Sequence, residues 1–274
     1  MPEEFASQWL TLREPADHTA RAMQCLHALT AYLGPDQALN ILDLGSGTGS
    51  NVRYLAPQLT AREQHWTLLD HDSGLLASAR EKIADFLLTS ASDRRIQITE
   101  WQSDLYALFA KPFRTDLITA SALLDLVSSD WIDQFVGYCS KHRLPVLFAL
   151  TFDGEISLRP THPDDAWIEQ LINAHQRGAK DMGQALGPDA TRYTVDAFAK
   201  AGFEVMERAS DWNLGPDQMA LQQATLNGWY DAAIDQAPTQ IERINHWFAQ
   251  RQSQHTQTHF RVGHRDILAL PCRA

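Results

Sequence analysis

Three glycines and three aspartates in the first half of the chain have the types and spacing of a binding site for a small molecule. The glycines form a G-x-G-x-G loop directly after an apolar run at residues 39–44, and a helical pattern follows them. Glycines there permit a tight turn and let the backbone approach a ligand closely. Each aspartate alone is a strand-end acid or a helix cap, and only their joint placement around the loop predicts a site. The six residues are Asp43, Gly45, Gly47, Gly49, Asp70 and Asp104.

The spacing of this loop differs from the dinucleotide-binding fingerprint. In that fingerprint, G-x-G-x-x-G, the last glycine lies three positions after the second, where this chain has Ser50. The glycines alone are therefore weak evidence for a binding site, and the interpretation depends on the aspartates.

The string Ile41-Leu42-Asp43-Leu44-Gly45-Ser46-Gly47-Thr48-Gly49, with Asp70 and Ser103-Asp104-Leu105 downstream, resembles the class I S-adenosylmethionine-dependent methyltransferases. By motif, the resemblance covers roughly residues 38–155, and beyond them it rests on strand order only. It implies S-adenosyl-L-methionine as the cofactor and S-adenosyl-L-homocysteine as the product.

The resemblance also implies a role for each residue of the site. The glycine loop passes under the methionyl part of the cofactor, Asp43 helps to hold its ammonium group, and Asp70 accepts hydrogen bonds from both ribose hydroxyls. Asp104 faces the adenine amino group, with the amide of Leu105 beside it. His71 departs from the family pattern, which commonly has an apolar residue there. The cofactor-binding residues expected on this basis are Asp43, Gly45, Ser46, Gly47, Gly49, Asp70, His71, Asp104, Leu105 and Ser121.

Methyl transfer is an in-line displacement in which the cofactor carries the reactivity, so the protein mainly aligns the acceptor and removes its proton if it has one. The segment after the fourth expected strand, where Asp125 follows Ser121, is where related enzymes place a polar residue near the methyl group. We expect Asp125 to act as a base or hydrogen-bond acceptor; the alternative is a helix-initiating or surface aspartate. The segment lacks Asn/Asp-Pro-Pro-Tyr, which argues against methylation of adenine or glutamine amides.

Basic residues near the amino terminus are candidates for binding a carboxylate. Arg13, His18 and Arg21 lie in or beside a helical segment of the kind that folds over the cofactor in related enzymes. Arginine binds carboxylates in bidentate fashion, from the methionyl end or from an acidic substrate. The alternative is an exposed helix face.

Further contacts to the acceptor are expected from residues beyond the fifth strand. Aromatic and polar side chains there border the expected pocket and together suit a small-molecule cavity, although each taken alone is better explained as a core or surface residue. The expected substrate-binding residues are Arg13, His18, Arg21, His162, Trp212 and Tyr230.

No metal site is expected. His255, His259 and His264 are close in sequence, but the stretch reads partly as a strand and has no carboxylate-histidine grouping. The cysteines, Cys25, Cys139 and Cys272, are far apart without a CxxC pair, so neither a disulfide framework nor a structural zinc site is predicted.

Strands and helices alternate along most of the chain, which predicts an α/β fold with a doubly wound, mostly parallel sheet. Seven strands are expected, and the helices between them include one capped by Asp72. The resemblance implies that this arrangement is the Rossmann-like methyltransferase fold, and helical lid insertions are expected. The expected strands lie at 39–44, 66–70, 96–101, 116–122, 145–151, 203–209 and 260–270.

The chain is expected to form a single methyltransferase domain over residues 1–274, because no linker separates independent units. Its expected parts are an N-terminal helical segment at 1–37, a cofactor-binding half at 38–154, helical lid insertions at 155–190 and 213–257, and sheet-completing elements at 191–212 and 258–274.

Composition narrows the function classes. The chain has 23 Lys and Arg against 34 Asp and Glu, a formal net charge of −11, which works against nucleic-acid binding. The amino terminus is acidic, unlike a signal peptide, and no apolar run approaches the roughly 18 residues that span a bilayer. We therefore expect a cytoplasmic protein with no nucleic-acid or membrane partner.

The leading function is methyl transfer to a small organic molecule bound beneath a helical lid. A cofactor-binding but non-catalytic subunit that acts through a protein partner is the alternative. A protein or RNA methyltransferase is disfavoured by the negative charge. The acceptor atom, the pathway and the oligomeric state are not encoded in any motif.

Overall fold

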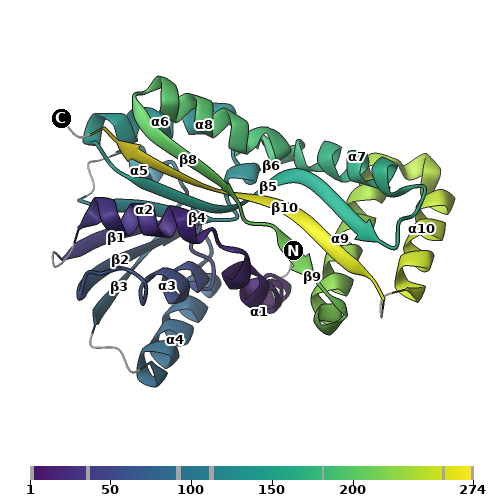
Figure 1. The fold of residues 1–274 in the computed structure, drawn as a ribbon, viewed down its shortest axis with the longest axis horizontal. Helices are drawn as coiled ribbons and strands as arrows, with labels where there is room; N and C mark the ends of the chain where they lie inside the picture. Colours follow the sequence, from purple (N-terminus) through teal and green to yellow (C-terminus); the bar gives the residue numbers. More distant parts are fainter. Residues whose placement is uncertain are drawn as a thin grey trace.

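One twisted sheet forms the centre of the molecule in the computed structural model, which describes residues 3–34, 38–90, 94–110, 114–180, 182–254 and 257–272, with side chains from residue 7 (Figure 1). Its strand order is β3-β2-β1-β4-β5-β10-β8, with β9 paired to β10. The strands β1 to β5 are parallel, and β10 is antiparallel to β5, β8 and β9. The strands are β1 (Leu39–Leu44), β2 (Glu63–Asp70), β3 (Arg95–Gln102), β4 (Leu117–Ser121), β5 (Val146–Arg159), β8 (Phe203–Ala209), β9 (Trp212–Leu214) and β10 (His259–Pro271).

Helices cover both faces of this sheet, as a mostly parallel sheet requires. Buried residues of α2, α3 and α4 pack on one face, and those of α6 and α8 pack on the other. The prediction of an α/β, doubly wound sheet is confirmed, with β9 as an additional strand. The helices are α1 (Glu3–Ala20), α2 (Met23–Leu33), α3 (Ser50–Leu55), α4 (Ser73–Thr89), α5 (Ala107–Ala110), α6 (Ser129–His142), α7 (Asp165–Gln176), α8 (Ala190–Lys200), α9 (Met219–Gln236) and α10 (Ile241–Ser253), with short 3₁₀ turns η1 (Leu124–Leu126), η2 (Gly187–Asp189), η3 (Pro216–Gln218) and η4 (Pro238–Gln240).

Local sequence explains the elements that flank the glycine loop. The strand β1 is apolar and almost wholly buried because it lies at the middle of the sheet. The helix α4 begins where expected, since the carboxylate of Asp72 accepts hydrogen bonds from the amides of Gly74 (2.8 Å) and Leu75 (3.1 Å). These elements fix the positions of the loop between β1 and α3 and of the end of β2.

The expectation of a helical insertion at 155–190 needs correction. Residue 155 lies inside β5, which continues to Arg159 and pairs with the first part of β10. Among its described residues, the segment then contains one long helix, α7, followed by a short hairpin of β6 (Ala179–Lys180) and β7 (Gly183–Gln184) and by η2.

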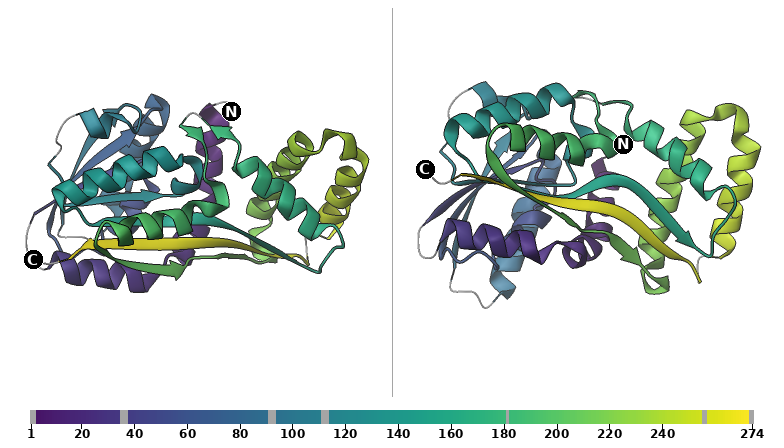
Figure 2. Two further views of the ribbon diagram at one scale, coloured as in Figure 1. Left: turned by 90° about the horizontal axis from the view of Figure 1, so that it is seen from above. Right: turned by 45° about the horizontal axis from the view of Figure 1, so that its top comes forward.

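Helices α7, α9 and α10 pack against the long β5–β10 pair and form what we name the extension (Figures 1 and 2). The extension has its own apolar core, which includes Trp212, Trp229, Trp247 and Phe260. Figure 2 shows α9 and α10 at the end of the molecule opposite to β1, β2 and β3. No helix within the described residues combines the length and apolar character needed to cross a membrane.

Candidate cofactor and acceptor site

The glycine loop has the backbone that its sequence predicts. Gly45, Gly47 and Gly49 have φ values of 58°, 52° and 74°, in the left-handed region that favours glycine. A Cβ at Gly49 would lie 2.7 Å from Cδ1 of Ile83, and one at Gly47 would lie 3.1 Å from Cδ1 of Leu10. The loop is therefore closely packed between α4 and α1, and side chains at these glycines would strain it.

Asp70 lies directly beside this loop at the end of β2. Its Oδ2 accepts a hydrogen bond from the amide of Gly47 (2.8 Å), and its Oδ1 accepts one from the amide of Asp72 (3.1 Å). The side chain of Asp70 is buried, whereas that of His71 is 77% exposed, with Nδ1 3.4 Å from Oδ1 of Asp70. Asp70 and His71 thus lie next to each other at the end of β2, the first buried and the second exposed to solvent.

Asp43 is buried beneath the loop in a polar network. Its Oδ1 accepts a hydrogen bond from Nδ2 of Asn51 (2.8 Å), while its Oδ2 has no partner among the described residues. Burial raises the pKa of Asp43 to about 7, and the Asn51 amide and Arg21 guanidinium act in the opposite direction. Asp43 is therefore poised to titrate near neutral pH.

Arg21 is buried, and its polar partners are groups of the protein. Its Nη1 donates to Oδ1 of Asn51 (2.9 Å), and its Nε lies 3.5 Å from Oδ2 of Asp266, a buried residue of β10. Asp266 also accepts hydrogen bonds from the amides of Ala22 and Leu150, both at 2.9 Å. Arg21 therefore joins the amino-terminal helices to the sheet, and the carboxylate that it meets belongs to the protein.

The remaining expected cofactor contacts lie at the same edge of the sheet. The amide of Ser103 donates to the carbonyl of Asp70 (3.0 Å), so the loop after β3 adjoins the end of β2. Asp104 is exposed and accepts a hydrogen bond from the amide of Ala107 (3.1 Å), while Leu105 is buried. Ser121 is half-buried at the carboxyl end of β4. Open α/β sheets bind their ligands at this edge.

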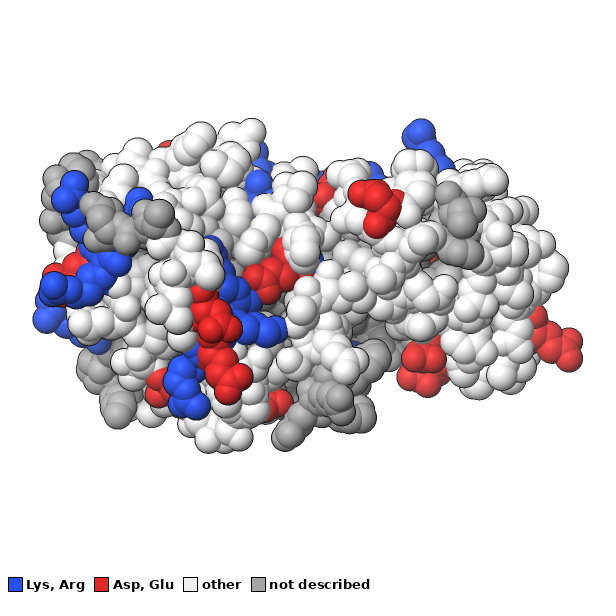
Figure 3. Space-filling model, turned by 90° about the horizontal axis from the view of Figure 1, so that it is seen from below, with Lys and Arg blue, Asp and Glu red and all other residues white. Residues whose placement is uncertain are grey.

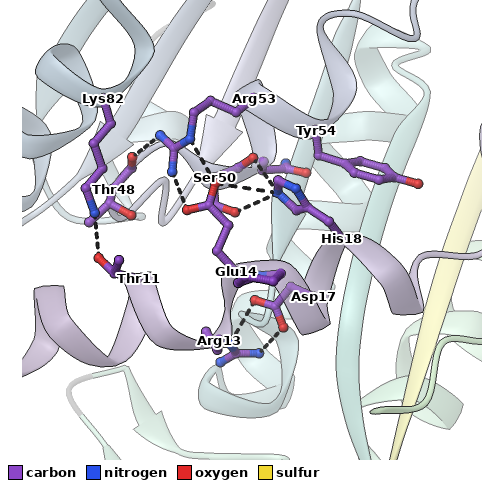
Figure 4. Close-up of polar contacts among 12 residues, drawn as sticks. Thr11, Arg13, Glu14, Asp17, His18, Thr48, Ser50, Arg53, Tyr54 and Lys82 are labelled. Atoms are coloured by element: carbon purple, nitrogen blue, oxygen red, sulfur yellow. Dashed lines mark hydrogen bonds and ion pairs between the residues drawn. The ribbon is translucent and has the colours of Figure 1, made fainter. Parts of the chain in front are cut away.

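Helix α1 lies across the glycine loop, and Figure 4 shows the polar contacts that hold it there. Glu14 pairs with Arg53, whose Nη1 donates to the carbonyl of Thr48 in the loop (2.7 Å). Nε2 of His18 lies 3.0 Å from Oγ of Ser50, and burial lowers the pKa of this histidine. His18 is thus a contact between α1 and the start of α3, close to the loop.

A second cluster lies beside the loop, and we name it the acceptor cluster. It consists of Trp9, Arg13 and Asp17 of α1, Asp125 of η1, Phe152 of β5, Trp212 of β9 and His264 of β10. Asp17 accepts hydrogen bonds from Nε of Arg13 (2.8 Å) and from Nε1 of Trp212 (2.9 Å). The guanidinium of Arg13 lies 4.8 Å from the Trp212 ring and 5.7 Å from the Trp9 ring.

Asp125 is the acid of this cluster. It is buried, and its Oδ1 has no hydrogen-bond partner among the described residues. Burial raises its pKa to about 6, while its own backbone amide, the Arg13 and Lys180 cations and the backbone amide of Phe152 act in the opposite direction. Leu123, two residues earlier, packs over Gly45, so η1 adjoins the glycine loop.

Three residues of the acceptor cluster were expected from the sequence to contact the acceptor, namely Arg13, Asp125 and Trp212. Phe152 was among the residues beyond the fifth strand that were expected to border the pocket. Trp9 and Asp17 were missed as site residues, and His264 was considered only as a metal ligand. The available signal was weak, because these residues are scattered over α1, β5 and β10.

Two expected substrate contacts lie elsewhere. The amide of His162 donates to Oδ2 of Asp165 (2.8 Å) at the start of α7, and the Tyr230 hydroxyl donates to Oδ1 of Asn245 (2.7 Å) between α9 and α10. Both are therefore engaged within the extension and outside the acceptor cluster.

Other candidate sites have little to hold a ligand. In the part of the chain that the structure describes, no group of three or more His, Cys, Asp or Glu side chains is arranged to hold a metal ion; His255 lies outside it. A groove of about 580 Å³ lies between α8 and the sheet, away from the glycine loop. Its Arg265 pairs with Asp153 (2.8 Å), and it collects no residue of the site described above.

Comparison with known proteins identifies a methyltransferase domain and proteins of similar fold. Residues 41–143 match a family model described as a methyltransferase domain. Of solved structures, the YcgJ protein from Bacillus subtilis is 10% identical with a TM-score of 0.51, over 92% of this chain and 100% of that one. A Bacillus halodurans protein assigned provisionally as a methyltransferase is 14% identical with a TM-score of 0.50, over 90% and 99%. No curated protein matches the sequence.

The residues present fit the cofactor that this domain implies. Oδ2 of Asp43, Oγ of Ser46 and Oγ1 of Thr48 are buried atoms without a partner in the described structure, and they lie in the glycine loop or at the end of the strand before it. Carboxylate and hydroxyl oxygens of this kind suit ammonium and ribose groups. Residues 41–143 thus form a methyltransferase domain, and the fold of the chain is that of S-adenosylmethionine-dependent methyltransferases.

Proposed function

We propose that this methyltransferase acts on a small organic molecule held in the acceptor cluster. The observation that carries the proposal is Asp125, a buried carboxyl group in η1 with an unpartnered Oδ1, next to the glycine loop. A buried carboxyl with a raised pKa beside a cofactor site has the properties of a general base.

The cofactor would be held by the residues around the glycine loop. Asp43 and the loop from Gly45 to Gly49 would bind its methionyl end, Asp70 its ribose, and Asp104 with Leu105 its adenine, while His71 and Ser121 border the site. When bound, S-adenosylmethionine supplies an electrophilic methyl carbon on a sulfonium centre.

The protein's own task is then to orient the acceptor and to take up its proton. Because the pKa of Asp125 is about 6, much of this residue is ionised at neutral pH and is ready to accept a proton. Arg13 lies on the same cluster and is held rigidly by Asp17 and two indole rings, so it supplies a fixed positive charge.

A small acceptor is favoured over a macromolecule by the surroundings of the cluster. Helix α1 covers the glycine loop, and the cluster residues Asp17, Asp125, Trp212 and His264 are buried. On the face shown in Figure 3, Lys and Arg are interspersed with Asp and Glu and form no extended basic surface. Nucleic-acid substrates require such a surface.

The test of this proposal is the turnover of Asp125→Asn, measured with any acceptor found by a methyl-release screen over metabolite fractions. The substitution keeps the shape of the side chain and removes the base, so we expect kcat to fall about 10² to 10⁴-fold. Binding of S-adenosylhomocysteine should not change.

The matched control is Asp130→Asn, which makes the same change at an exposed aspartate of α6. Its turnover should equal that of the wild type. Near-normal turnover of Asp125→Asn would remove the base from the proposal.

A further inference from the structure

His264 gives the acceptor cluster a hydrogen-bond acceptor of fixed orientation. It lies on β10 opposite Phe152 of β5, and its ring centroid is 5.1 Å from that of Trp212 and 6.2 Å from that of Phe152. Its Nδ1 lies 3.0 Å from the carbonyl oxygen of Val262. Since a carbonyl only accepts, Nδ1 must carry the hydrogen, and Nε2 then presents a lone pair.

This histidine stays neutral. Burial lowers its pKa to about 3, and the positive charge of Arg13 acts in the same direction, whereas the Val262 carbonyl and Asp211 act against it. A neutral ring with its hydrogen on Nδ1 cannot donate from Nε2. At any pH near neutrality, Nε2 of His264 can therefore only accept a hydrogen bond from a ligand.

Arg13 contributes a positively charged hydrogen-bond donor to the cluster. Its Nε and Nη2 both donate to Asp17, at 2.8 and 3.2 Å, and Nη1 takes part in neither bond. Its guanidinium lies 4.8 Å from the Trp212 ring, which lies 5.1 Å from the His264 ring, and its charge lowers the pKa of both Asp125 and His264. The cluster thus combines two acceptors, Oδ1 of Asp125 and Nε2 of His264, with one cationic donor.

This combination selects among ligand chemistries. A carboxylate has no hydrogen for Nε2 of His264 or for Asp125, and an ammonium group has no lone pair for Arg13. A hydroxyl group has both. The aromatic rings of Trp9, Phe152 and Trp212 that surround the polar atoms favour a flat ring as the body of the ligand.

We propose that the methyl acceptor is a hydroxylated aromatic molecule with two hydrogen-bond donors, one of them the reacting hydroxyl, and that His264 recognises the second donor. This proposal rests on the proposed function of the same site. Arg13 would contact the reacting oxygen, and Oδ1 of Asp125 would take up its proton. With S-adenosylmethionine bound, the electron pair of the oxygen would form the new bond to the methyl carbon as the methyl–sulfur bond breaks, and the pair of that bond would stay on the sulfur of S-adenosylhomocysteine. The second donor, held by Nε2 of His264, fixes the orientation of the ring.

The experiment uses binding of matched probes to the full chain in the presence of S-adenosylhomocysteine, followed by tryptophan fluorescence and calorimetry. The probes are dihydroxynaphthalenes with adjacent and with separated hydroxyls, their monomethyl ethers and the corresponding hydroxynaphthoates. We expect at least one dihydroxynaphthalene to bind, and to bind about tenfold more tightly than its ether and its carboxylate analogue, as the loss of one hydrogen bond implies.

The variant His264→Phe keeps a ring in place and removes the lone pair. We expect it to bind the dihydroxynaphthalene and its ether equally well, with unchanged affinity for S-adenosylhomocysteine. The control is His259→Phe, the same change at an exposed histidine of β10, which should keep the tenfold preference. If His264→Phe does not fold, the preference of the wild type decides the proposal alone.

The outcomes separate this inference from the function beneath it. A wild type that does not bind S-adenosylhomocysteine contradicts the proposed function itself. A wild type that binds it, but binds none of the dihydroxynaphthalenes or prefers the carboxylates, overturns the inference about the acceptor and leaves the methyltransferase assignment in place.

Discussion

The acids of the cofactor half and those of the extension differ in how they are paired. Asp43 and Asp125 are buried without a direct ion pair, and their pKa values are raised to about 7 and about 6. In the extension, Asp165 pairs with the buried Arg251 and Asp164 pairs with Arg243. The ion pairs link elements of the extension. The carboxyl groups of Asp43 and Asp125 have no such cation among the described residues and can take up a proton.

The largest expected effect comes from breaking a pair in the extension. Arg251 is almost wholly buried, pairs with Asp165 and donates to the carbonyl of Pro160 (2.6 Å). Arg251→Met leaves Asp165 without its cation, and we expect a loss of about 3 kcal/mol in the free energy of unfolding by urea.

The double variant Arg251→Met/Asp165→Asn tests whether pairing is the cause. It should recover part of that loss, because no uncompensated charge remains. A single variant as stable as the wild type would show that this pair does not hold the extension.

The second prediction concerns the pH dependence of stability. Asp43 has a pKa of about 7 in the folded protein and about 3.8 in the unfolded chain, so the folded state holds one more proton between these values. The stability that this proton confers is present below about pH 4 and is lost as the pH rises toward 7. Asn51, Arg21 and Asp70 are the groups that face this carboxyl.

Asp43→Asn should therefore gain stability relative to the wild type as the pH rises from 4 to 7. Urea unfolding of both proteins across this range measures the difference, and Asp130→Asn, at an exposed site, provides the reference. A difference that stays constant with pH would mean that Asp43 does not titrate in this window.

The smallest effect is expected at an exposed pair. Arg80 on α4 lies 3.0 Å from Glu100 on β3, and its side chain is 63% exposed. We expect Arg80→Gln to change the free energy of unfolding by less than about 0.5 kcal/mol, because solvent screens such pairs. A loss as large as that of Arg251→Met would remove the distinction between buried and exposed pairs.

The sequence predicts the cofactor half well because its signals are local. The glycine loop, the apolar run of β1 and the cap Asp72 each act within a few residues, so their positions follow from the chain itself. Asp70 and Asp104 are placed by the ends of parallel strands, which meet at one edge of the sheet.

The length of β5 was not predicted, because Asp153 and Gly154 look like a turn. In the structure they form an irregularity within a continuing strand, opposite a register shift in β10 between Val262 and His264. A Cβ at Gly263 would lie 2.1 Å from Oδ1 of Asp153. A glycine at this position therefore allows the side chain of Asp153 to pack against β10.

Long-range pairing explains the errors at the site. Arg21 was expected to meet a ligand carboxylate, but its partner Asp266 lies near the other end of the chain and is brought to it by β10. His264 enters the acceptor cluster for the same reason, through the register of β10 with β5. No spacing within the sequence reports such contacts.

The central claim is that the glycine loop and the end of β2 bind S-adenosylmethionine. Calorimetric titration of S-adenosylhomocysteine into the wild type and Asp70→Ala tests it, with Asp72→Ala as the neighbouring variant that removes only the cap of α4. We predict binding by the wild type and by Asp72→Ala, and affinity at least about a hundredfold weaker for Asp70→Ala, since hydrogen bonds to a charged group are lost. Equal affinity of Asp70→Ala and the wild type, or no binding by a folded wild type, would contradict the account.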